Sequence, residues 1–312
     1  MMTEYKHTRT HRRRKKGKHL APKKKVPLRT KLKVIAAAAV LALFVLGLSS
    51  RRTPTPGTNL PILMYHHFVL TDAKEDTVVS EERFREQMTA LRNAGYTAVT
   101  IPQLLDFVDN GAPLPDKPVL ITMDDGYTSN LDIAAPILES LGMNATVFVI
   151  GINEGEPVYV HSGEPFWQAR FSYEEAAPWV EKGIINPQSH TMDMHQLESY
   201  GYSGRDGMLP LPGESEEDYR KAIAEDLRQF RQRREGRVAS DFTALAYPFG
   251  YYSEELDNLL EEEGIAVTLT IDEHCNKLKA GDPSCLRMLG RFNVTDGISG
   301  AELVSRLNNA IK

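Results

Sequence analysis

The chain has 312 residues, of which 41% are hydrophobic and 25% are charged. This length and composition suit one sizeable globular domain with a full core, and they exclude a chain that is disordered throughout. The net charge of −5 is unevenly distributed, because residues 1–33 hold 14 of the 37 Lys and Arg residues and a single acid, Glu4. The remaining 23 basic and 41 acidic residues give residues 34–312 a formal charge of −18.

An uncharged apolar run, VIAAAAVLALFVLGL, follows the basic tail at residues 34–48. With two further serines and the long stems of the flanking Lys and Arg residues, the run approaches the ~20 residues of a membrane-spanning helix. We therefore predict a single transmembrane helix at residues 34–50. The basic tail, 1–33, should stay in the cytoplasm and the rest of the chain should lie outside the cell membrane. A cleaved signal peptide is the alternative, although GLSSRR does not resemble an A-x-A cleavage site.

Residues 51–59, RRTPTPGTN, are rich in Pro and Thr and are predicted to be a linker to a domain at 60–312. At no more than ~3.3 Å per residue, this linker gives the domain a reach of about 30 Å, so the substrate must come close to the membrane. A basic tail could also bind nucleic acid, but its position beside an apolar span makes membrane topology the simpler explanation. We expect no nucleic-acid partner.

From residue 60 onward, short apolar runs alternate with helical patterns. The runs at 61–68, 118–123 and 145–151 read as strands, and Ser80 is a plausible N-cap for the helix that follows it. Later strand and helix patterns continue the alternation to the end of the chain. This order predicts an α/β fold in which a parallel sheet or barrel is covered by helices. Catalytic residues should then lie at the C-terminal ends of the strands.

Asp124 and Asp125 stand at the end of one such strand, in ITMDDGY. Neighbouring side chains on a strand point to opposite faces, but Gly126 frees the backbone so that both carboxylates can reach one pocket. Each would raise the other's pKa, and a bound cation would remove that penalty. A plain turn is the alternative, because Asp and Gly are common turn residues.

A second cluster, SHTMDMH, contributes His190 and His195. The two imidazoles could converge only across a bend. Asp193 and Gln196 form a variant of the capping-box pattern, which predicts a bend and a helix that begins at Met194. One acid and two histidines form a typical ligand set for zinc or another divalent transition metal.

In this order, PILMYHH, TMDDGY, SHTMDMH and AYPFG resemble the motifs of the polysaccharide deacetylase family, also called carbohydrate esterase family 4 or the NodB-homology domain. The resemblance covers roughly residues 60–300, and the histidine spacing of five is similar to that of the subgroup that acts on poly-N-acetylglucosamine. It implies a distorted (β/α) barrel of the NodB-homology type. It also implies metal-dependent removal of N-acetyl groups from a cell-surface or cell-wall polysaccharide, so that an N-acetylated glycan is the expected partner.

The resemblance assigns roles to individual residues. It makes Asp124 the catalytic base and Asp125, His190 and His195 the ligands of a divalent metal, with zinc favoured over cobalt, nickel or manganese. Within the YPFG motif, the backbone N–H of Phe249 would help to hold the oxyanion that forms on the acetyl carbonyl.

The chain departs from the family pattern at two places. No Arg that could steady the base stands before the YPFG motif, and the late Leu-x-x-His is replaced by Leu289-Gly290-Arg291-Phe292. His274 is therefore a candidate general acid. The candidates for lining the pocket are His66, His67, Tyr247 and Pro248.

Cys275 and Cys285 are the two cysteines, and a location outside the cell would permit a disulfide between them. We favour this loop-closing disulfide over the alternative of two free thiols. Two classes of function remain. A membrane-anchored N-deacetylase explains the complete motif set, whereas a catalytically silent glycan-binding or scaffold protein would explain the missing late histidine. We favour the enzyme, because loss of activity usually damages the metal ligands first.

Overall fold

The computed structural model describes residues 57–71, 73, 75–239 and 241–312. Every described residue belongs to the second of two units of the chain, Thr55–Lys312. The predicted basic tail (1–33) and the predicted transmembrane segment (34–50) lie outside the described residues. Within the described part of the chain, no helix is both long enough and apolar enough to cross a membrane.

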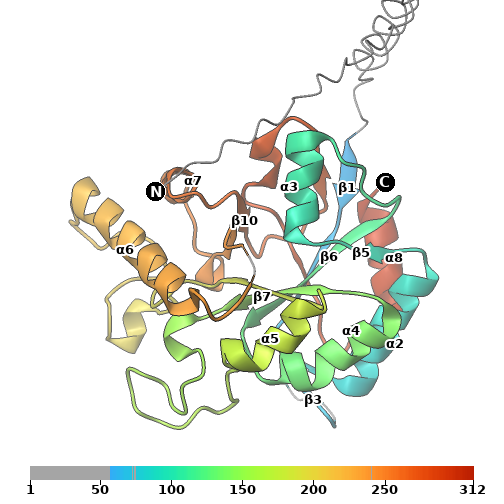
Figure 1. Cartoon of the computed structure of the whole chain (residues 1–312), viewed down its shortest axis with the longest axis horizontal. Helices are drawn as coiled ribbons and strands as arrows, with labels where there is room; N and C mark the ends of the chain where they lie inside the picture. The colour runs from blue at the N-terminus through green and yellow to red at the C-terminus, as the bar shows by residue number, and fades with distance from the viewer. Residues whose placement is uncertain (1–56, 72, 74, 240) are drawn as a thin grey trace, which may run out of the picture. The chain divides into compact units, whose positions relative to one another are not determined.

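Parallel strands form the central sheet of the second unit (Figure 1). The strand order is β10-β9-β8-β7-β6-β2-β12. Strand β5 is not part of this order but also pairs with β6. All of these pairings are parallel. The strands are β2 (Ile62–Tyr65), β5 (Thr97–Ala98), β6 (Pro118–Asp125), β7 (Ala145–Val149), β8 (Ile185–Ser189), β9 (Ala244–Ala246), β10 (Val267–Leu269) and β12 (Phe292–Asn293).

A short segment, residues 289–293, joins the two edges of this sheet. Leu289 forms a parallel bridge with Leu269 of β10, and Phe292 of β12 pairs with Leu63 of β2. The sheet therefore curls part of the way round a barrel, and this segment spans the remaining gap. The curled parallel sheet confirms the predicted α/β fold of the NodB-homology type.

Helices cover the outside of the sheet, as parallel strands require crossover connections (Figure 1). Ser80 begins the first described helix as predicted, because its hydroxyl accepts a hydrogen bond from the backbone N–H of Arg83. The helices are α2 (Glu81–Asn93), α3 (Ile101–Asn110), α4 (Ala135–Leu141), α5 (Tyr173–Glu181), α6 (Glu216–Arg234), α7 (Glu254–Glu262) and α8 (Gly300–Ala310). A short π-helix, Asn130–Ala134, precedes α4.

Strand β6 shows how the sequence separates the two faces of the sheet. Val119, Ile121 and Met123 join the apolar layer that also contains side chains of α2, α4 and α8. Leu120 lies in a different apolar cluster, inside the curl of the sheet. Because side chains alternate along a strand, Asp124 points to the same inner face as Leu120. The alternation alone therefore brings one of the two aspartates into the barrel interior.

The predicted strand at 61–68 is broken after Tyr65. β3 (His67–Val69) leaves the sheet and pairs with β4 (Val78–Ser80), and β1 (Thr58–Leu60) pairs with β11 (Asn276–Leu278) in a separate antiparallel pair. Tyr65 is in register with Met123. His66 therefore follows β2 at the level where Asp124 follows Met123.

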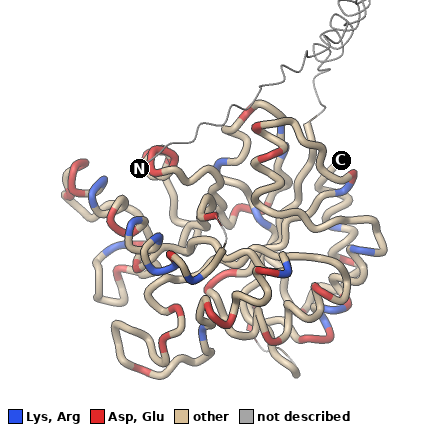
Figure 2. Tube along the Cα trace, viewed as in Figure 1, with Lys and Arg blue, Asp and Glu red and all other residues tan. Residues whose placement is uncertain are grey.

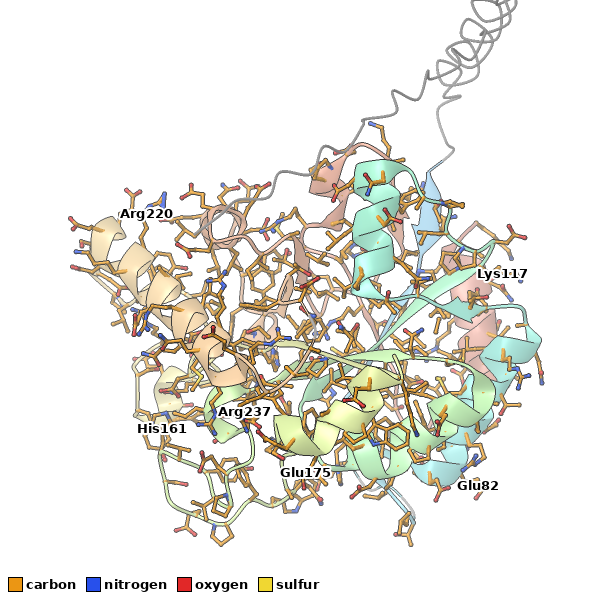
Figure 3. The ribbon with its side chains drawn as sticks, viewed as in Figure 1. Glu82, Lys117, His161, Glu175, Arg220 and Arg237 are labelled. Atoms are coloured by element: carbon orange, nitrogen blue, oxygen red, sulfur yellow. The ribbon has the colours of Figure 1, made fainter. Side chains whose placement is uncertain are left out.

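Charged side chains lie mainly on the outer helices, and α6 is the most highly charged of them (Figure 2). Its first turn holds three acids and its last turn three arginines, a distribution that the helix dipole favours. Arg237 lies just beyond this helix (Figure 3) and forms ion pairs with Glu174 of α5 and with the buried Glu154. These contacts fix the C-terminal end of α6 against the body of the domain.

Helices α2 and α8 meet at a glycine. A Cβ atom on Gly300 would lie 2.7 Å from the Cβ of Ala90 and 2.9 Å from the carbonyl oxygen of Glu86. We expect Gly300→Ala to lower the free energy of unfolding by about 1–2 kcal/mol, because overpacking outweighs the gain in helix propensity. Gly297→Ala is the control, since a Cβ atom there would lie 3.7 Å from its nearest neighbour, Oγ1 of Thr295. Urea unfolding of both variants measures the effect, and equal stabilities would contradict the close packing.

Candidate active site

The two aspartates at the end of β6 reach a common site because the backbone turns there. Asp125 has a φ of 73° and Gly126 a φ of 70°, so the strand ends in two successive left-handed residues. A non-glycine residue rarely adopts this conformation. The turn carries the carboxylate of Asp125 towards the same site as Asp124, which is only 2% exposed. This geometry agrees with the convergence predicted from the sequence.

His190 follows β8, two strands away from β6 in the sheet. It is buried, and its Nδ1 lies 2.8 Å from the carbonyl oxygen of Ala246 in β9. A carbonyl can only accept a hydrogen bond, so Nδ1 carries the proton. The lone pair of Nε2 is therefore left for a metal, the arrangement expected of a histidine ligand.

The predicted helix at Met194 is wrong, because residues 191–197 form a loop and the next helical turn begins at Glu198. The capping-box bond from the Asp193 N–H to the Gln196 side chain does not form: that N–H donates to Asp226, and the Gln196 amide instead donates to the Asp193 carboxylate and backbone carbonyl. The N–H groups of the loop donate to side-chain oxygen atoms in place of helical carbonyls. His195 lies near the end of this loop.

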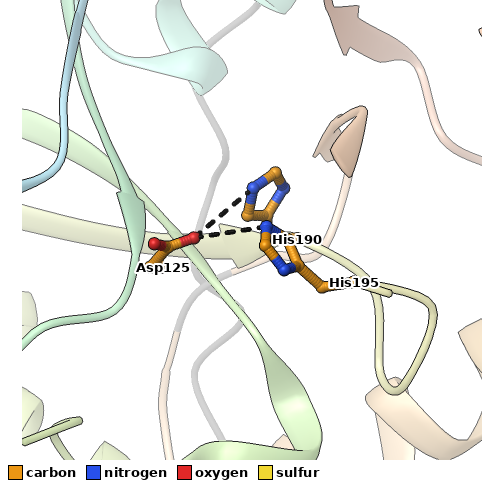
Figure 4. Close-up of side chains that lie close together, drawn as sticks. All are labelled: Asp125, His190 and His195. Carbon is orange, nitrogen blue, oxygen red and sulfur yellow. Dashed lines mark ion pairs between the residues drawn. The ribbon is translucent and has the colours of Figure 1, made fainter. Parts of the chain in front are cut away.

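The side chains of Asp125, His190 and His195 gather in one cluster (Figure 4). Oδ1 of Asp125 lies 3.4 Å from Nε2 of His195 and 3.7 Å from Nε2 of His190. All three ligand atoms lie within 4.8 Å of one another. The structure therefore brings together the three residues predicted to be metal ligands.

A divalent metal fits this cluster on two observations. Oδ1 of Asp125 is buried without a hydrogen-bond partner among the described residues, although two imidazole nitrogens face it. Ligand atoms around a tetrahedral zinc ion, with bonds of about 2.0–2.2 Å, lie roughly 3.4 Å apart. The donor set and the spacing therefore suit zinc or a related transition metal.

The electrostatic environment keeps the carboxylate of the cluster ionised and its imidazoles neutral, as metal binding requires. Burial would raise the pKa of Asp125, but electrostatic interactions with four basic side chains lower it overall: His195, Arg170, His66 and His190. Burial, with a contribution from His190, lowers the pKa of His195 to about 4. Burial also lowers the pKa of His190. At neutral pH the carboxylate is ionised and the imidazoles are neutral.

Arg170 is a neighbour of Asp125 that the sequence motifs did not indicate. Its Nη2 lies 3.7 Å from Oδ2 of Asp125, and its guanidinium stacks over the ring of Tyr127 at 3.6 Å. It therefore faces the carboxylate oxygen that the histidines do not face. With Arg170 on that side, Oδ1 is the oxygen that would hold a metal together with the two histidines.

Arg291 is a second neighbour of the aspartates that the sequence motifs did not indicate. Its side chain is fully buried, and Nη1 donates to Oδ1 of Asp124 at 2.7 Å. Burial would raise the pKa of Asp124, but Arg291, His190 and His66 lower it overall. Arg291 thus supplies the steadying cation that could not be found before the YPFG motif. Its signal in the sequence was a lone Arg in Leu289-Gly290-Arg291-Phe292.

The YPFG motif borders the ligand cluster. The ring of Phe249 lies 4.4 Å from that of His195, and Phe249 has a φ of 57°. Tyr247 is buried and donates to the carboxylate of Asp257, so it holds the motif in place instead of lining a pocket. Pro248 is also buried. The role of the Phe249 N–H towards an oxyanion stays a prediction.

The other three predicted histidines, His66, His67 and His274, differ in how they interact with the site. His66 is half-buried, and its charge lowers the pKa of both Asp124 and Asp125. His67 is buried, with Nδ1 2.8 Å from Oγ of Ser129, and burial lowers its pKa to about 4. His274 is exposed and packs against Gly290. None of the described contacts joins His274 to the ligand cluster.

The two cysteines are free thiols in the structure, so the predicted disulfide is not formed there. Cys285 contacts the backbone of Lys279 within its own loop, and Cys275 contacts the backbone carbonyl of Asn276. Each sulfur is therefore engaged locally and away from the other cysteine.

A pocket of about 320 Å³ opens beside His195. It lies between the loop that follows β7, which carries His161 (Figure 3), and the loop that follows β8. Tyr200 and Tyr202 are each 50% exposed and offer flat apolar faces. The lining includes Tyr159, His161, Arg170, His195, Tyr200 and Tyr202. A larger hollow of about 470 Å³ lies elsewhere and contains none of the predicted site residues.

Comparisons with known proteins agree with this geometry. The chain is 28% identical over 242 residues to "Putative polysaccharide deacetylase YxkH" of Bacillus subtilis (strain 168), which covers 78% of this chain and 74% of that protein. It is 25% identical over 258 residues to a poly-beta-1,6-N-acetyl-D-glucosamine N-deacetylase of Escherichia coli (strain K12). That match covers 74% of this chain but only 38% of the E. coli protein.

Solved structures show the same fold. IcaB from Ammonifex degensii superposes with a TM-score of 0.64 at 25% identity, over 82% of this chain and 99% of that one. A de-N-acetylase from Aggregatibacter actinomycetemcomitans gives a TM-score of 0.67 at 18% identity, over 80% and 99% of the two chains. The profile of the family described as "Polysaccharide deacetylase" matches residues 111–268, half of the chain. The chain therefore belongs to the polysaccharide deacetylase family.

Proposed function

We propose that this protein is a metal-dependent hydrolase that removes N-acetyl groups from a polysaccharide containing N-acetylglucosamine. The observation that carries the proposal is the cluster of Asp125, His190 and His195 beside the buried carboxylate of Asp124. A ligand set next to a separate base is what hydrolysis of an amide requires.

Asp125, His190 and His195 would hold the metal, for which we favour zinc, although cobalt, nickel or manganese also accept this donor set. When bound, such a metal supplies Lewis-acid chemistry towards the acetyl carbonyl and the attacking water. Asp124 takes the proton from that water. Arg291 keeps Asp124 ionised and fixes one of its oxygens, so that the other is left to act as the base.

The departing amine must receive a proton, and His66 is better placed to donate it than His274. His66 follows β2 at the level of Asp124, and its Nδ1 is buried without a hydrogen-bond partner among the described residues. Its charge also acts on both aspartates. In this proposal His66 takes the role that the resemblance assigned to a late histidine, and the Phe249 N–H helps to hold the oxyanion.

The likeness to poly-N-acetylglucosamine deacetylases supports a β-1,6-linked N-acetylglucosamine polymer as the substrate class. The pocket beside His195 supports a sugar, because exposed tyrosine rings and polar groups line it together.

We further propose that a transmembrane helix at 34–50 anchors the domain outside the cell, with residues 1–33 in the cytoplasm. The charge distribution of the sequence supports this topology.

Separate substitutions should distinguish the base from the ligands. We expect His190→Ala and His195→Ala to lose bound metal and acetate release together, because two remaining ligands hold the ion poorly. Asp124→Asn should keep the metal while turnover falls by about 10²- to 10⁴-fold, the usual share of general base catalysis. Metal content and acetate release from N-acetylglucosamine polymers are measured for each. Wild-type protein that binds one metal yet releases no acetate would support the silent glycan-binding alternative, and no bound metal would refute the site.

A second pair of variants tests the proton donor. His66→Gln should lower kcat by about 10²-fold or more, since it removes the proposed acid but leaves the metal ligands intact. His274→Gln should keep nearly all activity, because the described contacts do not connect it to the site. The reverse result would return the acid to His274.

The lowered pKa of His195 should appear in the pH dependence of stability. Between pH 4 and 6.5 the unfolded chain binds the His195 proton and the folded chain does not, so stability is lost as the pH falls through this range. The shift corresponds to at most about 3 kcal/mol. Urea unfolding of the chelator-treated protein at several pH values should therefore show a shallower dependence in His195→Gln than in the wild type. An unchanged dependence would show that His195 is not a buried neutral imidazole.

A further inference from the structure

The loop between the two histidine ligands is held by side-chain oxygen atoms. Residues 191–194 form no helix or strand, yet each backbone N–H in the loop donates to a side chain. The bonds are Thr191 N–H to Ser189 Oγ at 2.9 Å, Met192 N–H to Asp226 Oδ2 at 2.8 Å, Asp193 N–H to Asp226 Oδ1 at 2.8 Å, and Met194 N–H to Thr191 Oγ1 at 3.0 Å.

Asp226 is the one acceptor in this set that comes from a distant part of the chain. It lies on α6, 33 and 34 positions beyond its two partners, and it is only 6% exposed. Both of its oxygens are used, one for each of two successive N–H groups. A single carboxylate therefore connects the loop to α6. The C-terminal end of α6 is itself fixed by the ion pairs of Arg237.

The opposite side of the same loop is held by the chain that follows β7. Gly151 N–H donates to the carbonyl of Thr191 at 2.9 Å, and Ile152 N–H donates to that of Met192 at 2.7 Å. A Cβ on Gly151 would lie 2.7 Å from the sulfur of Met192, so the two segments are in close contact. The carbonyls of the loop are therefore bound by the segment after β7, and its N–H groups are bound by side chains. These bonds on both sides define the path of the loop.

The charge of Asp226 is costly where it lies. Burial raises the pKa of Asp226 to about 6, the two backbone bonds offset only part of the rise, and the nearby Asp193 charge adds to it. No Lys or Arg in the described part of the chain forms an ion pair with it. Because a buried carboxylate without a cation lowers stability, its position is better explained by function than by stability.

We propose that Asp226 is a positioning residue: its two hydrogen bonds set the path of residues 191–194 and so fix the separation of His190 and His195 before the metal binds. The inference rests on the proposed metal-dependent function. It gives α6 a role in the reaction although α6 supplies none of the proposed catalytic or ligand residues. Without this clamp, metal binding would have to order the loop, and affinity would fall.

Asp226→Asn and Asp226→Ala test the clamp in the full-length protein, with Glu225→Gln as the control. Glu225 is the neighbouring acid of the same helix, but it is exposed and pairs with Arg228. The first measurement is amide hydrogen exchange of the metal-free protein. We expect the N–H groups of Met192 and Asp193 to be protected in the wild type and in Glu225→Gln, and to lose protection in both Asp226 variants.

The second measurement is zinc affinity by competition with a chelator, together with the visible spectrum of the cobalt-loaded protein. The dissociation constant should rise about tenfold or more in the Asp226 variants, the scale of loss when the support of a ligand is removed. The cobalt spectrum should change as well, although the metal-free variants keep the circular dichroism of the folded wild type. A residue with a purely structural role would lower the melting temperature without changing the spectrum of the folded fraction.

The outcomes separate this inference from the proposed function. Wild-type affinity and spectrum in the Asp226 variants would overturn the clamp and leave the metal site intact. Unchanged amide protection would overturn it whatever the metal does. If the wild type binds neither zinc nor cobalt, the proposed metal-dependent function fails, and the positioning role fails with it.

Discussion

Two adjacent carboxylates buried at the end of one strand are the constraint on which the rest of the site depends. Asp124 and Asp125 could not both be ionised in a buried site without compensating groups. Arg291 compensates Asp124, whereas Arg170 and two imidazoles face Asp125. Arg291 belongs to the segment that spans the open side of the curled sheet. The same segment therefore completes the curled sheet and compensates the charge of Asp124. Closure of the sheet and the electrostatics of the site thus depend on one segment.

Backbone strain is also concentrated at the site. The non-glycine residues with positive φ in the described chain are Asp125, Thr191, Phe249 and Met288. The first three lie in the TMDDGY, SHTMDMH and AYPFG motifs, and the fourth precedes the segment that carries Arg291. Each such residue costs roughly 1–3 kcal/mol and persists only where its surroundings determine it. The apolar layers on the two faces of the sheet supply that support, which explains why the site is built on strand ends of a rigid sheet.

The sequence predicts what is local and periodic. It identified the strand that carries Asp124 and Asp125, the N-cap at Ser80 and the parallel sheet, because alternation and capping are visible over a few residues. It did not identify Arg291, whose partner is 167 positions away. The helix predicted at Met194 failed for the same reason: a capping pattern was present, but the N–H groups of Met192 and Asp193 are bound by Asp226 of a distant helix. Long-range hydrogen bonds to single side chains leave no period in the sequence.

The groups that shape the site also have opposite effects on stability. His195, with its pKa lowered to about 4, lowers stability as the pH falls from 6.5. Asp226, with its pKa raised to about 6, lowers stability as the pH rises from about 4, because its ionised form is the one that burial disfavours. The two effects overlap in range and differ in sign, so the stability of the wild type changes less with pH than either group alone would require. Above both shifted pKa values, at neutral pH, the His195 imidazole is neutral and the Asp226 carboxylate is ionised, which are the states that the proposed roles need.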